Sequence, residues 1–237
     1  MIASDPVIPN FGQASSCVLA NRLFCWDWVR DHWSDTLEPS LVQHVELTLI
    51  AVSIGFVLAF ALALLTHRVP ILEQPVSVTA ALVYTIPSIA AFLIVLPLYG
   101  VSNTTIEIPL TAYSLVLLYP NIAAGLRAAP PEVLEAARGM GLRRRQTLVR
   151  VELPLALPAI IGGLRIAVVS TVSIGTIGAL IGGKGLGEPI FVALGSPHPF
   201  RTEIYAAGLL VVALALSLDV VLICARRALV PWTRVRT

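Results

Sequence analysis

The chain has 237 residues, a formal net charge of +2, 57% apolar residues and only 13% charged residues. Its mean hydropathy of +0.85 excludes an ordinary soluble domain, which needs far more polar surface. The small net charge gives no indication of nucleic-acid binding, and the composition predicts an all-α membrane protein with several spans.

The first 40 residues differ in composition from the rest of the chain. Two arginines are outnumbered there by five acidic residues: Asp5, Asp27, Asp31, Asp35 and Glu38. Trp26, Trp28 and Trp33 also lie close together. Because tryptophan favours the membrane interface, we expect residues 1–40 to form an extracytoplasmic segment with a short interfacial amphipathic helix. Docking of a partner and simple anchoring are equally open as its role.

The chain has three cysteines. Cys17 and Cys25 fall in the segment expected on the oxidising side, so a disulfide between them can form, although their spacing does not require one. Cys224 falls in the last apolar stretch, where we expect it to pack within the protein.

Five apolar stretches are long enough to cross the roughly 30 Å hydrocarbon core as helices. They are residues 41–65, 76–98, 107–127, 155–181 and 204–227. The second contains Pro87 and ends at Pro97. Prolines are tolerated inside spanning helices when neighbouring groups bind the freed carbonyls. We therefore predict a membrane domain of five transmembrane helices, residues 41–228, followed by a tail, residues 229–237.

The basic residues are distributed unevenly between the two sides of the membrane. With residues 128–154 placed in the cytoplasm, eleven arginines lie on that side: Arg68, Arg127, Arg138, Arg143, Arg144, Arg145, Arg150, Arg226, Arg227, Arg234 and Arg236. The other side holds four basic residues: Arg22, Arg30, Lys184 and Arg201. The positive-inside rule therefore predicts an N-terminus outside and a C-terminus inside.

Four ionisable residues of the predicted spans are candidates for a functional role. His44 and Glu46 lie near the outer end of the first span, where we favour interfacial exposure over a role in binding a cationic substrate. Arg165 and Asp219 lie in the cytoplasmic third of the fourth and fifth spans. They could pair across the two helices. Alternatively, Arg165 reaches the inner interface and Asp219 faces a wet cavity.

The loop of residues 128–154 has the signals of a short exposed helix. Pro131 suits the first helical turn, Glu132 favours the helix dipole there, and Gly141 stands where a C-terminal cap is expected. Four residues at helical spacing form one narrow face: Val133, Ala136, Ala137 and Met140. A second short helix, residues 143–152, is predicted to return the chain to the membrane. These patterns fit either a helix that docks to another protein or an ordinary connecting loop.

The same loop resembles the EAA loop of ABC importer permeases. The motif is Glu-Ala-Ala, three residues, Gly, nine residues, and then an aliphatic residue, any residue and Leu-Pro. The matching residues are Glu135, Ala136, Ala137, Gly141, Val151, Leu153 and Pro154, with Gly139 and Met140 inside the motif. The resemblance implies a fold like that of type I ABC importer permeases. It also implies that residues 135–141 dock into a groove on a separate ATPase subunit.

A narrower resemblance, to osmoprotectant importer permeases, lies in residues 84–100, 139–167 and 181–191. That subfamily moves quaternary amines such as glycine betaine, choline, carnitine and proline betaine. Four residues are candidates for the translocation path: Tyr84, Pro87, Ser88 and Asn121. Tyr84 departs from the Gln that is usual in relatives.

The resemblance also implies the partners and the location of the chain. We expect ABC ATPase subunits that carry ATP and Mg, a second permease subunit that is identical or homologous, and an extracytoplasmic substrate-binding protein. The chain itself is expected to bind no cofactor and to catalyse no reaction. Its location would be the cell membrane, in contact with lipid.

Three alternatives to this interpretation have less support in the sequence. Residues 178–184 (GALIGGK) begin like a phosphate-binding loop, but Gly185 follows where Ser or Thr is needed, so we expect a glycine-rich turn. An importer permease for an amino acid such as methionine is the alternative within the family. A self-sufficient secondary transporter is the alternative from another class, and it lacks support because no internal repeat is evident.

Overall fold

A computed structural model describes residues 16–231, and these residues form helices and turns without a strand. The shortest helices are α1 (Ser16–Leu19), α2 (Trp26–Asp31), α7 (Pro131–Gly139), α8 (Arg144–Thr147) and α10 (Gly187–Gly195). The longer helices are α3 (Glu38–Arg68), α4 (Glu73–Thr85), α5 (Ser88–Tyr99), α6 (Asn103–Arg127), α9 (Leu153–Gly182) and α11 (Arg201–Leu229). The all-α prediction is therefore confirmed.

The chain divides into two compact units. Unit 1 comprises Met1–Leu49, Ser88–Glu107 and Val172–Ala215, and unit 2 comprises Ile50–Pro87, Ile108–Thr171 and Leu216–Thr237. Helices α3, α6, α9 and α11 each contribute residues to both units. The predicted site residues fall mostly in unit 2.

Within the described residues, four helical stretches are long and apolar enough to cross a membrane. They are Trp33–Arg68, Asn103–Arg127, Arg144–Gly182 and Arg201–Leu229. These stretches confirm the first, third, fourth and fifth predicted spans. A bent pair, Pro70–Thr85 and Ser88–Tyr99, raises the number to five if it counts as one span.

The second span is broken at Pro87. The two helices of this pair meet at an angle of 92°. Ile86 has extended backbone angles, φ −68° and ψ 124°, and the ring of a following proline disfavours the helical conformation at such a position. The prediction of a helix that continues through Pro87 is therefore wrong, whereas Pro97 is accommodated inside α5.

In unit 1, hydrogen bonds join the N-terminal segment to the start of α11. A disulfide joins Cys17 and Cys25, whose Cα atoms are 5.9 Å apart. The Asn21 side chain donates to the carbonyl of Pro199 and accepts from the backbone N–H of Arg201, both at 3.0 Å. A small apolar core lies beneath this segment: Val29, Leu37, Ala206 and Ala207.

Unit 1 also contains the glycine-rich turn, which is packed against α3. Gly183 and Gly185 have positive φ angles of 57° and 75°, which glycine adopts readily. The backbone N–H of Leu186 donates to His44 Nδ1 at 3.2 Å, so His44 Nε2 carries the proton that is donated to the Val172 carbonyl at 3.0 Å. The glycine-rich turn is confirmed.

His44 is therefore not an interfacial residue. It is only 1% exposed, because the turn after α9 covers it. The prediction of interfacial exposure for His44 is wrong, while Glu46 is exposed as expected. Cys224 also differs from expectation, because its side chain is exposed and not packed within the chain.

Unit 2 is built around close helix crossings. Its core consists of Ala59, Ala63, Leu118, Tyr119, Ile122, Ala123, Leu126, Ala156, Ile160 and Ala167. A Cβ on Gly163 of α9 would stand 2.6 Å from the Cβ of Asn121 on α6. A Cβ on Gly125 would stand 3.0 Å from the Cβ of Ala159. Small residues of this kind let the backbones of membrane helices approach closely.

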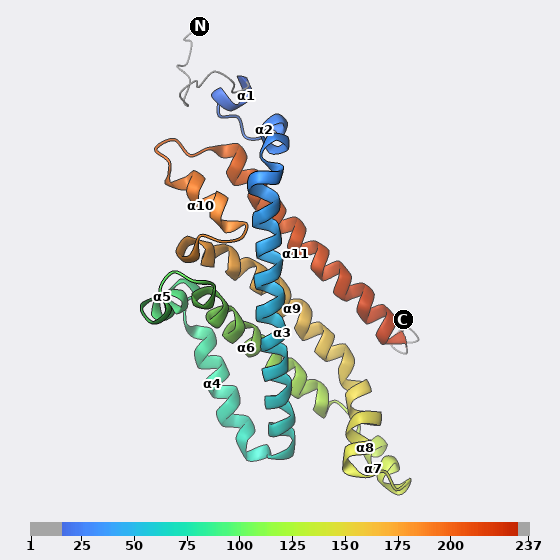
Figure 1. The fold of residues 1–237 in the computed structure, drawn as a ribbon. Coiled ribbons are helices and arrows are strands. Elements are labelled where there is room, and N and C mark those ends of the chain that lie inside the picture. The colour runs from blue at the N-terminus through green and yellow to red at the C-terminus, as the bar shows by residue number, and fades with distance from the viewer. Residues whose placement is uncertain (1–15, 232–237) are drawn as a thin grey trace. The chain divides into compact units, whose positions relative to one another are not determined.

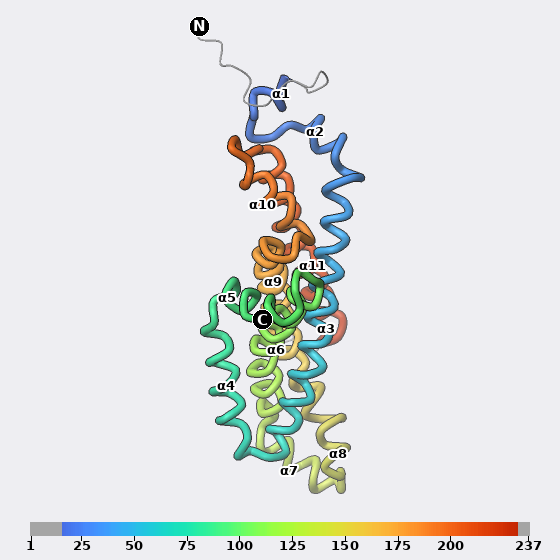
Figure 2. The backbone as a smooth tube through the Cα atoms, turned by 60° about the vertical axis from the view of Figure 1, so that its left-hand side comes forward, coloured from blue at the N-terminus to red at the C-terminus, as the bar shows by residue number. Residues whose placement is uncertain are grey.

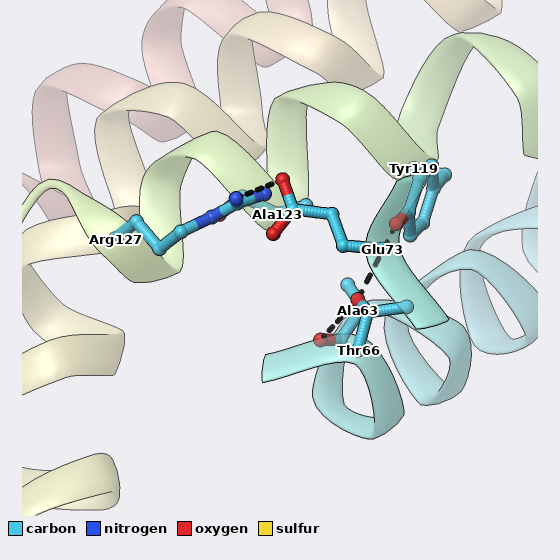
Figure 3. A network of polar contacts seen from close by, with 6 residues as sticks. All are labelled: Ala63, Thr66, Glu73, Tyr119, Ala123 and Arg127. Carbon is cyan, nitrogen blue, oxygen red and sulfur yellow. Dashed lines mark hydrogen bonds and ion pairs between the residues drawn. The ribbon is translucent and has the colours of Figure 1, made fainter. Parts of the chain in front are cut away.

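Polar contacts tie α3 and α4 of unit 2 to α6 (Figure 3). The side chain of Arg127, at the end of α6, forms an ion pair with Glu73 at the start of α4. Tyr119 donates its hydroxyl proton to Thr66 Oγ1 at 3.4 Å, and Thr66 donates to the carbonyl of Ala63 at 3.1 Å. In both views the chain reverses direction between the end of α3 and the start of α4 (Figures 1 and 2). The sequence reasoning did not identify these contacts.

Candidate functional site

The predicted coupling helix is α7. It begins with Pro131 at its first position and has Glu132 in its first turn, as the sequence indicates. At its end, the N–H of Gly141 donates to the Arg138 carbonyl at 2.9 Å, and the N–H of Leu142 donates to the Ala137 carbonyl at 3.1 Å. These are the two bonds of a Schellman motif, and they require the positive φ of 78° that Gly141 has.

The four residues predicted to form one face of α7 differ in their exposure. Ala137 is 1% exposed, whereas Val133 is 41% and Met140 is 75% exposed. Ala136 is exposed as well, so the predicted face does not stay together: Ala137 points into the chain and the other three residues lie outside. Glu135 and Gly139 are also exposed. This short helix therefore presents small and apolar side chains at the surface of the chain.

The return to the membrane is a continuous helix and not a separate short one. The helical stretch Arg144–Gly182 includes a π-helical turn, Leu148–Glu152, directly before Leu153 and Pro154. Pro154 has no N–H to offer the carbonyl of Arg150, and the wider turn lies where that bond is missing. The prediction that a second helix ends near residue 152 is wrong, because Pro154 stands in the first turn of α9 and does not stop it.

Two of the four candidate path residues line one groove in unit 2, with a volume of about 350 Å³. Its lining consists of Ser77, Ala80, Ala81, Tyr84, Val116, Leu117, Tyr119, Pro120, Asn121 and Ile166. Tyr84 is 58% exposed, so its side chain is accessible in this groove. The Asn121 side chain donates to the carbonyl of Leu117 at 2.8 Å. Pro87 and Ser88 lie instead at the break between α4 and α5.

The sequence reasoning missed other residues of this groove, although a signal for them exists. Ser77, Ala80 and Ala81 precede Tyr84 at the spacing of one helix face, so all four residues of α4 line the groove together. Tyr119 contributes to the lining while its hydroxyl group binds Thr66. Applying the helical period backwards from Tyr84 would have found the α4 residues.

The intramembrane candidates Arg165 and Asp219 are in direct contact. Arg165 Nε donates to Asp219 Oδ1 at 2.7 Å, and Arg165 Nη2 donates to Asp219 Oδ2 at 2.9 Å. This two-point geometry is the strongest that a guanidinium and a carboxylate adopt. The structure therefore brings together the two residues of the pairing hypothesis.

These features can be compared with known proteins. Residues 51–235 match the family described as "Binding-protein-dependent transport system inner membrane component". The chain belongs to this family. It is thus the permease component of an ABC importer, a multi-pass protein of the cell membrane.

Relatives of known name include permeases for choline and for osmoprotectants. The chain is 31% identical over 189 residues to the choline transport system permease protein OpuBB of Bacillus subtilis, covering 80% of this chain and 86% of that protein. It is 37% identical over 182 residues to the osmoprotectant import permease protein OsmW of Salmonella typhimurium, covering 75% of this chain and 84% of that protein.

Solved structures share the fold. The chain is similar in fold to a structure of the MetNI methionine ABC transporter in an inward-facing conformation, with a TM-score of 0.74 and 22% identity, covering 84% of this chain and 98% of that one. It is also similar to an amino acid ABC transporter solved with histidines, with a TM-score of 0.72 and 19% identity, covering 85% of this chain and 97% of that one. At these identities the likeness concerns the fold alone.

Proposed function

We propose that the chain is the permease subunit of an importer for osmoprotectant quaternary amines, driven by separate ATPase subunits that grip α7. The main observation behind the proposal is that α7 is a short exposed helix whose C-terminal end is capped at Gly141. Two relatives are named as permeases for choline and for osmoprotectants, and these names support the substrate class.

The surface of α7 suits a close protein contact. Around Gly139 no atom lies within 4 Å of where a Cβ would stand, so packing within the chain does not require glycine there. Ala136 and Gly139 leave the helix backbone accessible, while Met140 supplies a flexible apolar side chain. A groove on the ATPase could therefore enclose α7 closely. The Schellman motif would keep the C-terminal end of α7 helical while the ATPase moves it.

The groove beside Tyr84 is the proposed part of the translocation path. Quaternary ammonium groups are attracted to the faces of aromatic rings, and Tyr84, which is 58% exposed, lines this groove. No acidic residue lines it, so a substrate cation would meet aromatic and amide groups without a fixed counter-ion. This arrangement suits a passage site that binds weakly and releases its substrate.

The remaining parts of the importer follow from the same proposal. The N-terminus lies outside and the C-terminus inside, with residues 128–154 in the cytoplasm. An extracytoplasmic binding protein delivers the substrate, and a second permease, identical or homologous, completes the pathway. ATP and Mg are bound by the partner ATPases, whose closure moves α7 and switches the paired permeases from inward-open to outward-open.

Uptake into liposomes tests the substrate class. The permease, its ATPase and its binding protein are reconstituted together, and uptake of labelled choline, glycine betaine, carnitine and methionine is compared with and without internal ATP. ATP-dependent uptake of a quaternary amine, with no uptake of methionine, is the expected result. Uptake of methionine alone would support the amino-acid alternative, and uptake without ATP would support a secondary transporter.

A further inference from the structure

A polar pocket of about 240 Å³ lies where the last part of the 128–154 loop meets the end of α3, and the function proposed above does not use it. It is bordered by the end of α3 and by the helix that returns from the loop. Its lining residues are His67, Arg68, Arg144, Arg145, Leu148 and Glu152, all in unit 2. Two parts of the chain that are far apart in the sequence therefore place arginines around one cavity.

The pocket has an excess of positive charge. Its lining has three guanidinium groups and one carboxylate, and Glu152 Oε2 already contacts His67 Nε2 at 2.9 Å. This contact joins the end of α3 to the return helix. Within residues 16–231, the guanidinium groups of Arg68, Arg144 and Arg145 form no ion pair with a carboxylate. The lining residues thus leave this charge available to an anion.

The pocket lies where two membrane spans end. Arg68 lies three residues beyond the first predicted span, residues 41–65, and Glu152 lies three residues before the fourth, residues 155–181. The ends of membrane spans lie at the level of the lipid head groups, where phosphate is the commonest anion. Leu148 adds an apolar side chain to the lining.

We propose that this pocket binds the phosphate group of an anionic phospholipid. The planar guanidinium fork matches the oxygen atoms of a phosphate and can donate two parallel hydrogen bonds to them. The Arg68 side chain reaches the phosphate from α3, and those of Arg144 and Arg145 reach it from the return helix. Leu148 contacts the apolar part of the lipid. A bound lipid would thereby link the coupling loop to the membrane surface.

Calorimetry on the purified full chain in neutral detergent tests this site. The probes are a short-chain phosphatidylglycerol, a phosphatidylcholine of the same chain length and inorganic phosphate. The test variant is Arg68→Gln/Arg145→Gln. Its matched control is Arg138→Gln/Arg150→Gln, which removes the same charge from exposed arginines outside the pocket lining. Loss of roughly fivefold in affinity is expected for each guanidinium removed, so the test variant should bind phosphatidylglycerol about 25-fold more weakly.

The control variant should change the affinity less than about threefold, and phosphatidylcholine should bind far more weakly than phosphatidylglycerol. Equal losses in the two variants would show a diffuse surface charge and would overturn the site. Inorganic phosphate that binds as tightly as the lipid would overturn the lipid assignment and point to a soluble phosphate. Binding of phosphatidylcholine as tight as that of phosphatidylglycerol would also contradict the proposal.

Discussion

Arg165 of α9 and Asp219 of α11 hold each other through two hydrogen bonds of 2.7 and 2.9 Å. Both residues stand inside helices long and apolar enough to span the membrane. An isolated charge in such a helix is unfavourable, whereas a paired charge is largely neutralised by its partner. The contact therefore joins α9 to α11 and relieves each helix of an unpaired charge.

This pairing predicts a specific pattern in a mutant cycle. Arg165→Ala and Asp219→Ala should each lower the melting temperature of the purified chain, because each leaves one charge without its partner. The double variant should melt closer to the wild type than either single variant, because it leaves no unpaired charge. Thermal unfolding in detergent measures the cycle. A double variant that is no more stable than either single one would show that the pairing contributes nothing.

The His44 contact predicts that two neighbouring glycines differ in their tolerance of alanine. Gly183 and Gly185 both have positive φ angles, so Gly183→Ala and Gly185→Ala should each cost about 1–2 kcal/mol of stability. A Cβ at Gly185 would also stand 2.9 Å from His44 Nδ1, whereas the nearest atom to one at Gly183 is 4.0 Å away.

Gly185→Ala should therefore be the more destabilising change, and it should open the turn to trypsin at Lys184. Thermal unfolding and the rate of cleavage after Lys184 are the measurements. Adding His44→Ala should not restore stability, because it removes the acceptor for the Leu186 N–H. Equal effects of alanine at Gly183 and Gly185 would argue against a close contact between the turn and His44.

The crossing of α6 and α9 makes a similar prediction for two adjacent residues. Gly163→Ala would place a Cβ 2.6 Å from that of Asn121, whereas nothing lies within 4 Å of a Cβ at Gly162. Gly163→Ala should cost on the order of 1–3 kcal/mol through overpacking, and Gly162→Ala should be close to neutral. The free energy of unfolding in detergent checks both. If the two variants proved equally stable, α6 and α9 would not cross at Gly163.

The parts of the fold that depend on local chemistry could be predicted. Hydropathy identified four spans, and Pro131 and Gly141 marked the ends of α7, because a missing N–H and a positive φ are properties of single residues. The break at Pro87 was not predicted, since proline inside a membrane helix can be accommodated, as Pro97 is. Its local signal was the extended preference of Ile86.

Contacts between distant segments were harder to predict. His44 was expected at the interface, but the turn at Leu186 buries it. Leu186 lies 142 residues further along the chain, so no local pattern indicates this contact. The pair of Glu73 and Arg127 is separated by 54 residues, and no pattern in the sequence joins them. Arg165 and Asp219 could be proposed as partners only because a lone charge in a membrane span needs compensation.

We propose that α7 is the coupling helix, which an ATPase subunit binds and moves during transport. The tagged chain is expressed with its ATPase, purified in detergent, and the amount of ATPase that is retained is measured. Ala136→Glu and Gly139→Glu add a charge to exposed positions of α7, and Ala128→Glu adds the same charge to an exposed position before this helix.

The wild type and Ala128→Glu should retain the ATPase, and the two α7 variants should retain at least about tenfold less, because an unpaired carboxylate in a close contact is poorly tolerated. All four proteins should show the same thermal stability, since these positions are exposed. Equal retention by all four proteins would contradict the role of α7. Purification of the wild type without an ATPase, together with transport in the absence of ATP, would contradict the importer mechanism itself.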